Sequence, residues 1–358
     1  MSFVHLHVHS EYSLLDGLSH IPQLIERTKS LDMPAVALTD HGTMFGAIEF
    51  YRTARAAGVK PIVGMEAYLA PRTMSDRDPQ KDSRAYHLLL LAENDTGYQN
   101  LLQIASAAQL QGFYYKPRVD REFLAAHSEG LICTTGCLSA DVPRALQRGD
   151  IETAVKRLDW YYQVFGKDRF FIELQSHGIP ELDDVNKKLL DLAPRYQARF
   201  VATNDVHYVD PEDADLQDIM LCIQTGNVRS DPDRMRMADG TFYLRSPEEM
   251  EGLFGHVPGA LENTLLIAER CEVDLEFKGY HLPQFDVPEG ETPESYLRGL
   301  CLRGLERRYG QRADDLAIRQ RLDYELGIIH EMGFDTCFLI VWDLCRHAND
   351  QGIWYNAR

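Results

Sequence analysis

Short apolar runs alternate with amphipathic segments along residues 20–203. The runs have the length of strands buried on both faces, and the segments between them place apolar side chains at helical spacing. This alternation predicts an α/β fold with a parallel sheet. The predicted strands are 35–39, 62–68, 86–91, 130–135, 170–174 and 200–203, and the clearest predicted helices are 20–31, a helix that ends at Gly58, 151–165 and 181–197.

The first stretch of the chain, Phe3–Ser10, alternates polar and apolar residues and predicts a seventh strand. A period of two places His5, His7 and His9 on one face, with the deeper His5 packed and the outer two available to bind metal. Seven strand–helix units over this length fit a closed barrel better than an open sheet. A dinucleotide-type open sheet has a glycine-rich loop after its first strand, and this sequence has none there.

The pattern changes beyond residue 210, where the predicted strands stop. Residues 250–271 have helical periodicity, and Pro283, Pro288 and Pro293 then punctuate a linker. We therefore predict a boundary near residue 280, between a barrel domain (1–280) and a smaller all-helical segment (281–358). The helical patterns of that segment are 295–309, 316–332 and 337–349.

Composition and charge limit the functional classes. The apolar fraction of 44% and the charged fraction of 26% are those of an ordinary globular protein. The sequence has neither a long apolar span nor a signal peptide, so we predict no membrane contact, and its seven scattered cysteines fit a reducing cytoplasm. The formal net charge of −18 weighs only mildly against a nucleic-acid substrate, because bound metals reverse the local field.

Side chains that bind metals stand at or just beyond the ends of most predicted strands. In barrels of this kind the carboxyl ends of the strands form the active site, so these residues are expected to converge. Together they exceed the needs of one tetrahedral zinc and predict two or three divalent metals, with Glu66 or Asp205 as a bridging carboxylate. Singly, each has a plain explanation, such as a strand-to-helix turn at His41 or a small buried Cys137. The candidate ligands are His7, His9, Asp16, His41, Glu66, His87, Cys137, Asp205 and His207.

These motifs resemble those of the PHP (polymerase and histidinol phosphatase) family of metal-dependent phosphoesterases. Longer stretches resemble the N-terminal PHP domain of bacterial replicative DNA polymerase III alpha subunits, and the helical tail resembles the start of that polymerase's core. The resemblance implies a distorted seven-stranded barrel, a cluster of three metals and, in some members, 3'-5' exonuclease activity. The stretches are FVHLHVHSEYSLLDG (3–17), PIVGMEAY (61–68), YYKPR (114–118), NDVHY (204–208), EMGF (331–334) and WYNAR (354–358).

The family's ligand positions are all filled, with Cys137 where phosphatase members have His. This donor set fits zinc first and also admits manganese or iron. Glu66, Asp205 and His207 are the predicted catalytic residues. The aspartates of the polymerase palm, with their magnesium, are expected beyond residue 358, so this fragment is not expected to polymerise DNA.

Lys116 and Arg118 are candidates to bind a substrate phosphate, with a solvated loop as the alternative interpretation. The predicted function is metal-dependent removal of nucleotides from a DNA 3' end, as in proofreading. Predicted partners are DNA, the sliding clamp and other subunits of the replicative holoenzyme, including a proofreading subunit. The alternatives are a phosphomonoesterase like histidinol phosphatase, and a non-catalytic scaffold braced by metals.

Overall fold

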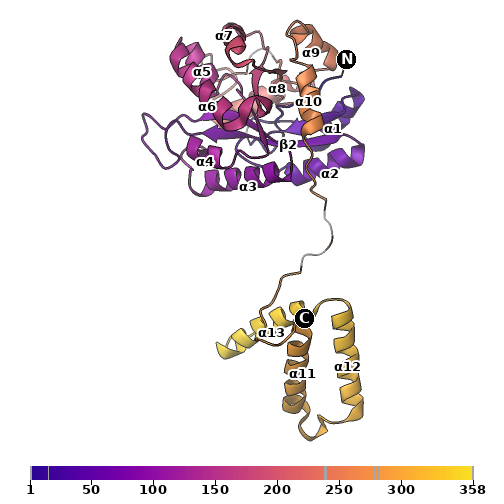
Figure 1. Cartoon of the computed structure of the whole chain (residues 1–358). Helices are drawn as coiled ribbons and strands as arrows, with labels where there is room; N and C mark the ends of the chain where they lie inside the picture. Colours follow the sequence, from indigo (N-terminus) through magenta and orange to yellow (C-terminus); the bar gives the residue numbers. More distant parts are fainter. Residues whose placement is uncertain (1, 15, 238–239, 277–278, 280–281, 357–358) are drawn as a thin grey trace. The chain divides into compact units, whose positions relative to one another are not determined.

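The computed structural model describes residues 2–14, 16–237, 240–276, 279 and 282–356. The chain consists of two compact units, Met1–Leu275 and Glu276–Arg358 (Figure 1). The boundary predicted between residues 280 and 281 falls on positions outside the described ones, and so do Leu15 of the first motif and the last two residues of the WYNAR stretch. Among the described residues, no helix is long and apolar enough to cross a membrane.

The first unit is a mixed α/β fold built on a curled sheet, as the sequence predicts. The sheet has seven strands, which are the six predicted between residues 35 and 203 and the short strand Arg118–Val119, which was not predicted; the predicted strand Phe3–Ser10 is not among them. The spatial order along the sheet is β1-β2-β3-β5-β6-β7, and the short β4 pairs with β2. The strands are β1 (Ala35–Leu38), β2 (Lys60–Leu69), β3 (Tyr86–Ala92), β4 (Arg118–Val119), β5 (Leu131–Thr134), β6 (Phe170–Leu174) and β7 (Phe200–Ala202).

β3 departs from the predicted parallel sheet, because it runs antiparallel to both β2 and β5. The segment between β2 and β3 contains no helix, so the chain turns back without the crossover that a parallel pair requires. The start of β3 therefore lies at the carboxyl ends of its neighbours, where His87 pairs in register with Tyr68 of β2. This direction explains how a residue at the start of a strand reaches the same end of the sheet as the other candidate ligands.

The N-terminal segment Phe3–Ser10 closes the sheet between β1 and the end of β7. The backbone N–H of Ala37 donates to the carbonyl of His5 (2.9 Å), and that of Val206 donates to the carbonyl of His7 (3.0 Å). The segment forms isolated bridges rather than a continuous strand, with a bend at His7. These two seams complete a distorted barrel, which is the predicted fold class.

The bend also corrects the predicted histidine face. Leu6 packs in the cluster inside the barrel, whereas Val8 packs in the outer layer, so the alternation is interrupted between them. The ring of His5 bonds to the carbonyl of Arg245 (2.9 Å) and stays apart from the other two histidines. The prediction that three histidines share one face is therefore wrong for His5, because a strict period of two requires an unbroken strand.

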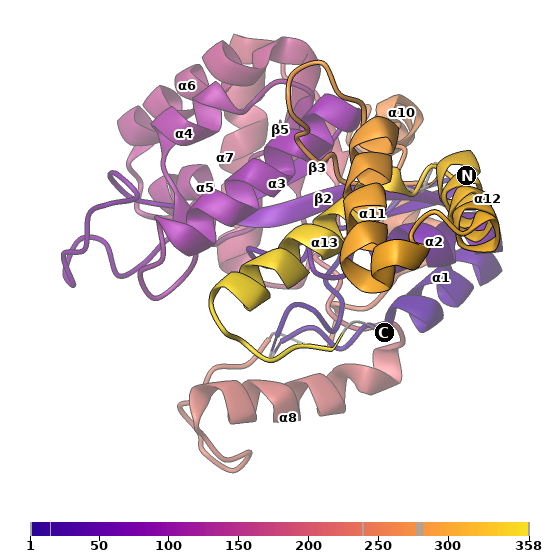
Figure 2. The same ribbon diagram turned by 90° about the horizontal axis from the view of Figure 1, so that it is seen from below.

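The core has an inner and an outer part. The inner cluster takes residues from the N-terminal segment and from most strands, and it is closed at one end by Ile267 and Cys271 of α10 and its C-terminal cap. The outer cluster fills the space between strands and helices, and Figure 2 shows α3 lying along β2 and β3. The helices are α1 (Ile21–Ser30), α2 (Ala47–Ala57), α3 (Asp95–Leu110), α4 (Arg121–Ala126), α5 (Asp141–Gln147), α6 (Ile151–Arg169), α7 (Pro180–Tyr196), α8 (Ala214–Thr225), α9 (Pro247–Phe254) and α10 (Glu262–Arg270).

Helix ends follow the local sequence. Gly58 caps α2 with a left-handed φ of 78°, which confirms the predicted stop, since glycine adopts this conformation without strain. The helical pattern 250–271 is in fact two helices, because Pro258 and Gly259 interrupt it between α9 and α10.

The second unit is helical, as predicted. Leu297, Leu326 and Leu339 form its small core, one from each of the three main helices. Thr292 and Ser295 make a capping box at the start of the first of them. These helices are α11 (Pro293–Tyr309), α12 (Leu316–Glu331) and α13 (Asp335–Asp350).

Candidate metal centre

The structure brings all nine candidate ligands together at one end of the barrel. They come from the N-terminal segment and its following loop, from β2 and the start of β3, and from the loops after β1, β5 and β7. Each makes a short contact to at least one other member, so residues up to 200 positions apart form one cluster.

Glu66 is the hub of the cluster and is 1% exposed. Its Oε1 lies 3.2 Å from His7 Nε2, 3.0 Å from His87 Nδ1 and 3.6 Å from Cys137 Sγ. Its Oε2 lies 2.5 Å from His41 Nδ1. One carboxylate thus faces three imidazoles and a thiol, which is the geometry expected of a carboxylate that bridges ions.

Asp205 is the second carboxylate of the centre. Its Oδ1 lies 3.2 Å from the Nε2 atoms of both His7 and His9. The residue adopts a left-handed backbone with a φ of 47°, which is uncommon for a residue with a side chain and concentrates at functional sites. The Nδ1–H of His207 donates to the Asp205 carbonyl (2.8 Å), which leaves His207 Nε2 as the atom available to a ligand.

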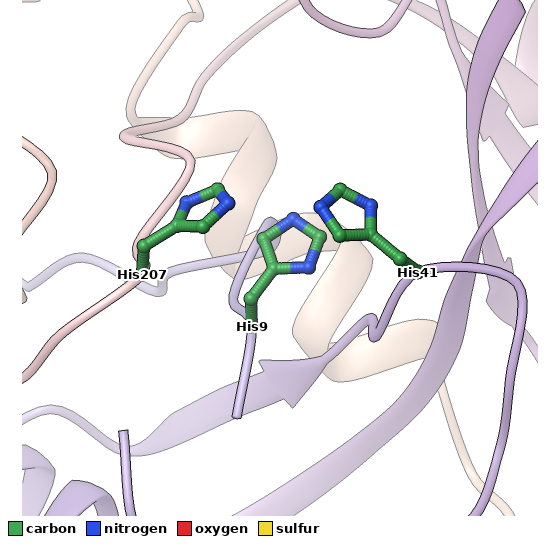
Figure 3. A group of neighbouring side chains, drawn as sticks. All are labelled: His9, His41 and His207. Carbon is green, nitrogen blue, oxygen red and sulfur yellow. The ribbon is translucent and has the colours of Figure 1, made fainter. Parts of the chain in front are cut away.

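Three imidazoles face one another across the mouth of this cluster. Figure 3 shows the rings of His9, His41 and His207 gathered side by side, and the His9 ring centroid lies 4.1 Å from that of His41 and 4.4 Å from that of His207. Three groups of three residues could each hold a metal ion, because within each group the ligand atoms lie within 4.8 Å of one another. Because the sets share members, the arrangement suits more than one ion. They are His9–His41–His207, His7–His9–Glu66 and His41–Glu66–His87.

Unpartnered buried atoms test whether these residues fit metals. Six buried nitrogen and oxygen atoms of the cluster make no well-oriented hydrogen bond among the described residues, although they crowd one another, as at 2.5 Å between His41 Nδ1 and Glu66 Oε2. Without metal, only imperfect contacts between carboxylates and protonated imidazoles offset their burial, whereas bound cations would meet their lone pairs directly. The donor set therefore fits divalent metals. The six atoms are His7 Nε2, His9 Nε2, Asp16 Oδ1, His41 Nδ1, Glu66 Oε2 and Asp205 Oδ1.

Comparison with known proteins identifies the family. The PHP domain model matches residues 5–177, and the model described as "Bacterial DNA polymerase III alpha NTPase domain" matches residues 295–358. The DNA polymerase III alpha subunits of Borreliella burgdorferi and Treponema pallidum are 46% and 47% identical over 98% and 99% of this chain. The chain belongs to the DNA polymerase III alpha family. It spans 31% and 30% of the length of these two relatives.

Solved structures with the same domain type are more distant. A two-domain protein from Bacteroides vulgatus, described as containing a predicted PHP-like metal-dependent phosphoesterase, is 13% identical, with a TM-score of 0.32 over 69% of this chain and 61% of that one. In this chain, the residues that match the PHP domain model, 5–177, include the candidate ligands from His7 to Cys137. Asp205 and His207 lie beyond it and are placed in the centre by the geometry alone.

The charges around the candidate metal centre determine which of its imidazoles are protonated when no metal is bound. Burial disfavours a charged His7, but Asp205, Glu173 and Glu66 outweigh this and raise the pKa of His7 well above its usual value. Burial also opposes charge on His41, but Glu66 and Asp16 raise the pKa of His41 to about 10. Burial and the neighbouring His41 lower the pKa of His9 to about 3. At neutral pH, two of these imidazoles thus carry a proton that a bound metal must displace.

We expect Zn²⁺ binding to release protons. His7 and His41 have raised pKa values, so both are protonated at neutral pH in the metal-free protein and must lose a proton to bind metal, whereas His9 is already neutral. Calorimetric titration at pH 7.5 in buffers of different ionisation enthalpy should show release of about three protons per chain, two from these imidazoles and one from the Cys137 thiol, whose pKa is raised by burial, and affinity should rise with pH. A release of zero, or affinity independent of pH between 6 and 9, would contradict this assignment.

Glu173 of β6 is a functional residue that the motifs missed. Its Oε1 accepts from His7 Nδ1 (2.7 Å), from Thr203 Oγ1 (2.6 Å) and from Gln175 Nε2 (2.9 Å). A carboxylate that binds the far nitrogen of a metal ligand fixes its tautomer and aims the near nitrogen at the metal. The signal was present in the sequence, since Glu173 is the one charged residue in the otherwise apolar run Phe170–Leu174.

We expect Glu173→Gln to weaken metal binding about 10- to 100-fold, because the amide no longer fixes His7 in the required tautomer. Competition against a chromogenic zinc chelator measures this affinity. The matched control is Glu181→Gln at the exposed start of α7, which should bind as the parent does. Equal affinities in the two variants would show that the Glu173–His7 contact has no orienting role.

His177 is a further candidate ligand that sequence reasoning did not weigh. It is buried, its Nδ1 lies 2.9 Å from Thr241 Oγ1, and its ring stacks on Phe242 with centroids 3.9 Å apart. Its Nε2 has no hydrogen-bond partner among the described residues. Burial lowers the pKa of His177 to about 4, so it is a neutral donor close to Asp205.

The structure corrects one of the two candidate phosphate ligands. Arg118 is buried, and its guanidinium donates to the carbonyls of Gly112 (3.2 Å), Asp82 (3.0 Å) and Asp76 (3.0 Å), so it anchors loops and is not presented to a substrate. The sequence could not show this, because the loop whose carbonyls accept from Arg118 lies far from it in the chain. Asp76, for example, precedes Arg118 by 42 residues.

Lys116 occupies a different position. It is exposed, and its Nζ lies 5.2 Å from the centre of the Tyr68 ring. That ring in turn lies 5.2 Å from the ring of His87, so Lys116 stands at the rim of the metal centre.

Proposed function

We propose that the first unit is a metal-dependent phosphodiesterase that removes nucleotides from the 3' end of DNA. The observation that carries the proposal is the cluster of six buried donor atoms without a well-formed hydrogen bond, three from carboxylates and three from imidazoles. Overlapping ligand sets around shared residues support several adjacent ions, and such ions suit the attacking and leaving oxygens of a phosphodiester. Membership of a DNA polymerase family supports DNA as the substrate.

Divalent metals, when bound, would lower the pKa of a water molecule and stabilise negative charge on the phosphate. The chain's own residues would hold that arrangement. Glu66 and Asp205 place carboxylates between the imidazoles, and His207 presents Nε2 because its Nδ1–H is engaged by the Asp205 carbonyl. We assign the catalytic positions to these three residues.

Recognition of the DNA end would use the rim. Lys116 over Tyr68 can neutralise a phosphate beside His87. Tyr115 is 65% exposed and packs edge-on against Tyr114 at 4.7 Å, which offers an aromatic surface for an unstacked base. Activity of the complete polymerase, its magnesium site, its contacts with the clamp and other subunits, and a cytoplasmic location remain proposals drawn from the relatives.

The test is digestion of a 5'-labelled primer with a mismatched 3' end by metal-analysed protein. We expect two or three divalent ions per chain and stepwise shortening from the 3' end, abolished by EDTA and restored by added metal. Purification without chelators that yields no bound ion, together with no shortening at any added metal, would refute the proposal. Hydrolysis of a small phosphomonoester but not of the primer would favour the histidinol-phosphatase alternative.

The scaffold alternative has one observation in its favour. The N-terminal segment contributes His7 and His9, while the end of β7 contributes Asp205 and His207, so bound metal would lock the seam that closes the barrel. A ligand that binds only the folded state stabilises it by an amount that grows with the logarithm of its affinity and concentration. A fall in Tm upon chelation without any nuclease activity in the metal-loaded protein would establish this role instead.

A further inference from the structure

Three arginines gather beside the metal centre without an acidic partner. Arg144 and Arg148 lie on α5 and at its C-terminal cap, four residues apart and therefore on the same side of the helix. Arg84 lies in the loop that leads into β3. None of the three has a carboxylate within ion-pair distance among the residues that the structure describes, whereas the nearby Arg121 pairs with Asp141.

Arg144 lies at the rim of the donor cluster, and Arg84 and Arg148 lie close to Arg144. The Nη1 of Arg144 donates to the carbonyl of Ala85 (3.4 Å), two residues before His87. His87 in turn bonds through its backbone N–H to Ser139 (3.2 Å), in the short loop between Cys137 and α5. The α5 arginines and the ligands His87 and Cys137 are thus connected through two adjacent loops.

The aromatic ring of Tyr86 supports Arg144 from one side. The guanidinium of Arg144 lies 5.5 Å from the Tyr86 ring centre, and that of Arg157 lies 5.0 Å from it. Arg157 is held by Asp141, with Nε 3.8 Å from Oδ2. Stacking restricts the rotamers of Arg144, so its charge is fixed at the rim rather than free in solvent.

The electrostatic balance favours an anion at this position. Burial lowers the pKa of Arg144, and the adjacent Arg84 and Arg148 lower it further, so the three cations are close enough to repel one another. Because no carboxylate pairs with these arginines, their positive charges are available to an incoming anion, and their mutual repulsion makes binding of an anion between them favourable. Arginine is the residue best suited to bind phosphate oxygens in pairs.

We propose that Arg84, Arg144 and Arg148 bind consecutive backbone phosphates of a single DNA strand whose 3' end lies at the metal centre. This inference rests on the proposed function and names the contacts that hold its substrate. Several cations along one rim fit a polyanion better than one isolated phosphate. Because the contacts go to the backbone, binding does not depend on the base sequence.

The experiment measures binding of a fluorescent, phosphorothioate-linked oligothymidylate to the metal-loaded chain by anisotropy at several salt concentrations. Changing all three residues to Gln should weaken binding about 10- to 100-fold at low salt and reduce the slope of log K against log salt by about 2, since each single-strand phosphate contact contributes about 0.7. The matched control is Arg52→Gln on the exposed side of α2, which should leave both affinity and slope unchanged.

Two further readouts separate the possible outcomes. The triple variant should retain its metal content and hydrolyse bis-p-nitrophenyl phosphate as the parent does, with only KM for the oligonucleotide raised. An unchanged affinity and salt slope in the triple variant would overturn the arginine site, even if the parent digests DNA. Loss of binding in the triple variant, when the parent binds DNA but hydrolyses no phosphodiester, would support the arginine site and refute the exonuclease. If the triple variant misfolds, the single exposed Arg148→Gln decides, because it should reduce the salt slope by about 0.7 and an unchanged slope would overturn the arginine site.

Discussion

Replacing Glu66 with Gln is expected to remove most of the bound metal, reduce phosphodiester hydrolysis to background and destabilise the fold. Glu66 is 1% exposed and faces His7, His41 and His87. Burial opposes its ionisation, but the neighbouring imidazoles lower the pKa of Glu66 well below its usual value, so its surroundings require its negative charge. Removing one partner of a buried charged group costs about 3–5 kcal/mol, because the remaining charges lose their compensation.

Chemical denaturation and metal analysis of the same preparation measure both effects. Without metal, Glu66→Gln should have a lower free energy of unfolding than the parent. Added Zn²⁺ should then raise the free energy of unfolding of the parent more than that of the variant. Glu26→Gln on the exposed side of α1 is the control and should change neither quantity. Full metal content and parental stability in Glu66→Gln would show that this carboxylate is neither a ligand nor a counter-charge.

The fold was largely predictable because each strand is a short apolar run with helices or loops at its ends. What failed were inferences that need long-range information. The direction of β3 depends on a connection without a helix, and the predicted parallel arrangement assumed one. The bend at His7 depends on the two seams that hold the N-terminal segment between β1 and the end of β7. Neither feature leaves a periodic signal in the sequence.

The convergence of the candidate ligands was predictable for a chemical reason. Several histidines and carboxylates at the ends of neighbouring strands form a costly cluster of polar groups unless they serve a common function such as metal binding. His87 was correctly predicted to join the cluster, although the predicted parallel direction of its strand was wrong, because β3 runs antiparallel and begins where its neighbours finish. Glu173 escaped because it acts through His7 rather than at the metal, and no motif marks such a residue. Arg118 misled because its exposure depends on a distant loop that covers it.

Cys137 is the ligand that departs from the phosphatase pattern, and substitution there separates two explanations of its role. Its Sγ lies 3.6 Å from both Glu66 Oε1 and His87 Nδ1. Burial, then Glu66 and Asp205, raise the pKa of the thiol well above its usual value. In the metal-free protein Cys137 is therefore a neutral thiol, and only a bound cation can make it a thiolate ligand.

If Cys137 is a ligand, Cys137→Ala should lose one ion per chain, and Cys137→His should keep the ion and part of the activity, because imidazole replaces the donor. If Cys137 only fills space, the smaller Ala should leave the metal count unchanged, and the larger His should disrupt the packing. Ion counts on the two purified variants decide between the explanations, and an unchanged count in Cys137→Ala would exclude this residue from the site.

The reactivity of the thiol gives an independent check that does not require activity. A metal-bound sulfur is shielded, whereas the metal-free thiol can be oxidised to acids that change the geometry and charge of the donor. Peroxide treatment should therefore reduce later zinc binding more quickly in metal-free than in metal-loaded protein. Cys133 is the internal comparison, because it is buried among the β5 side chains outside the donor cluster and should react slowly in both forms. Equal loss of zinc binding with and without metal would mean that no ion protects Cys137, which contradicts its role as a ligand.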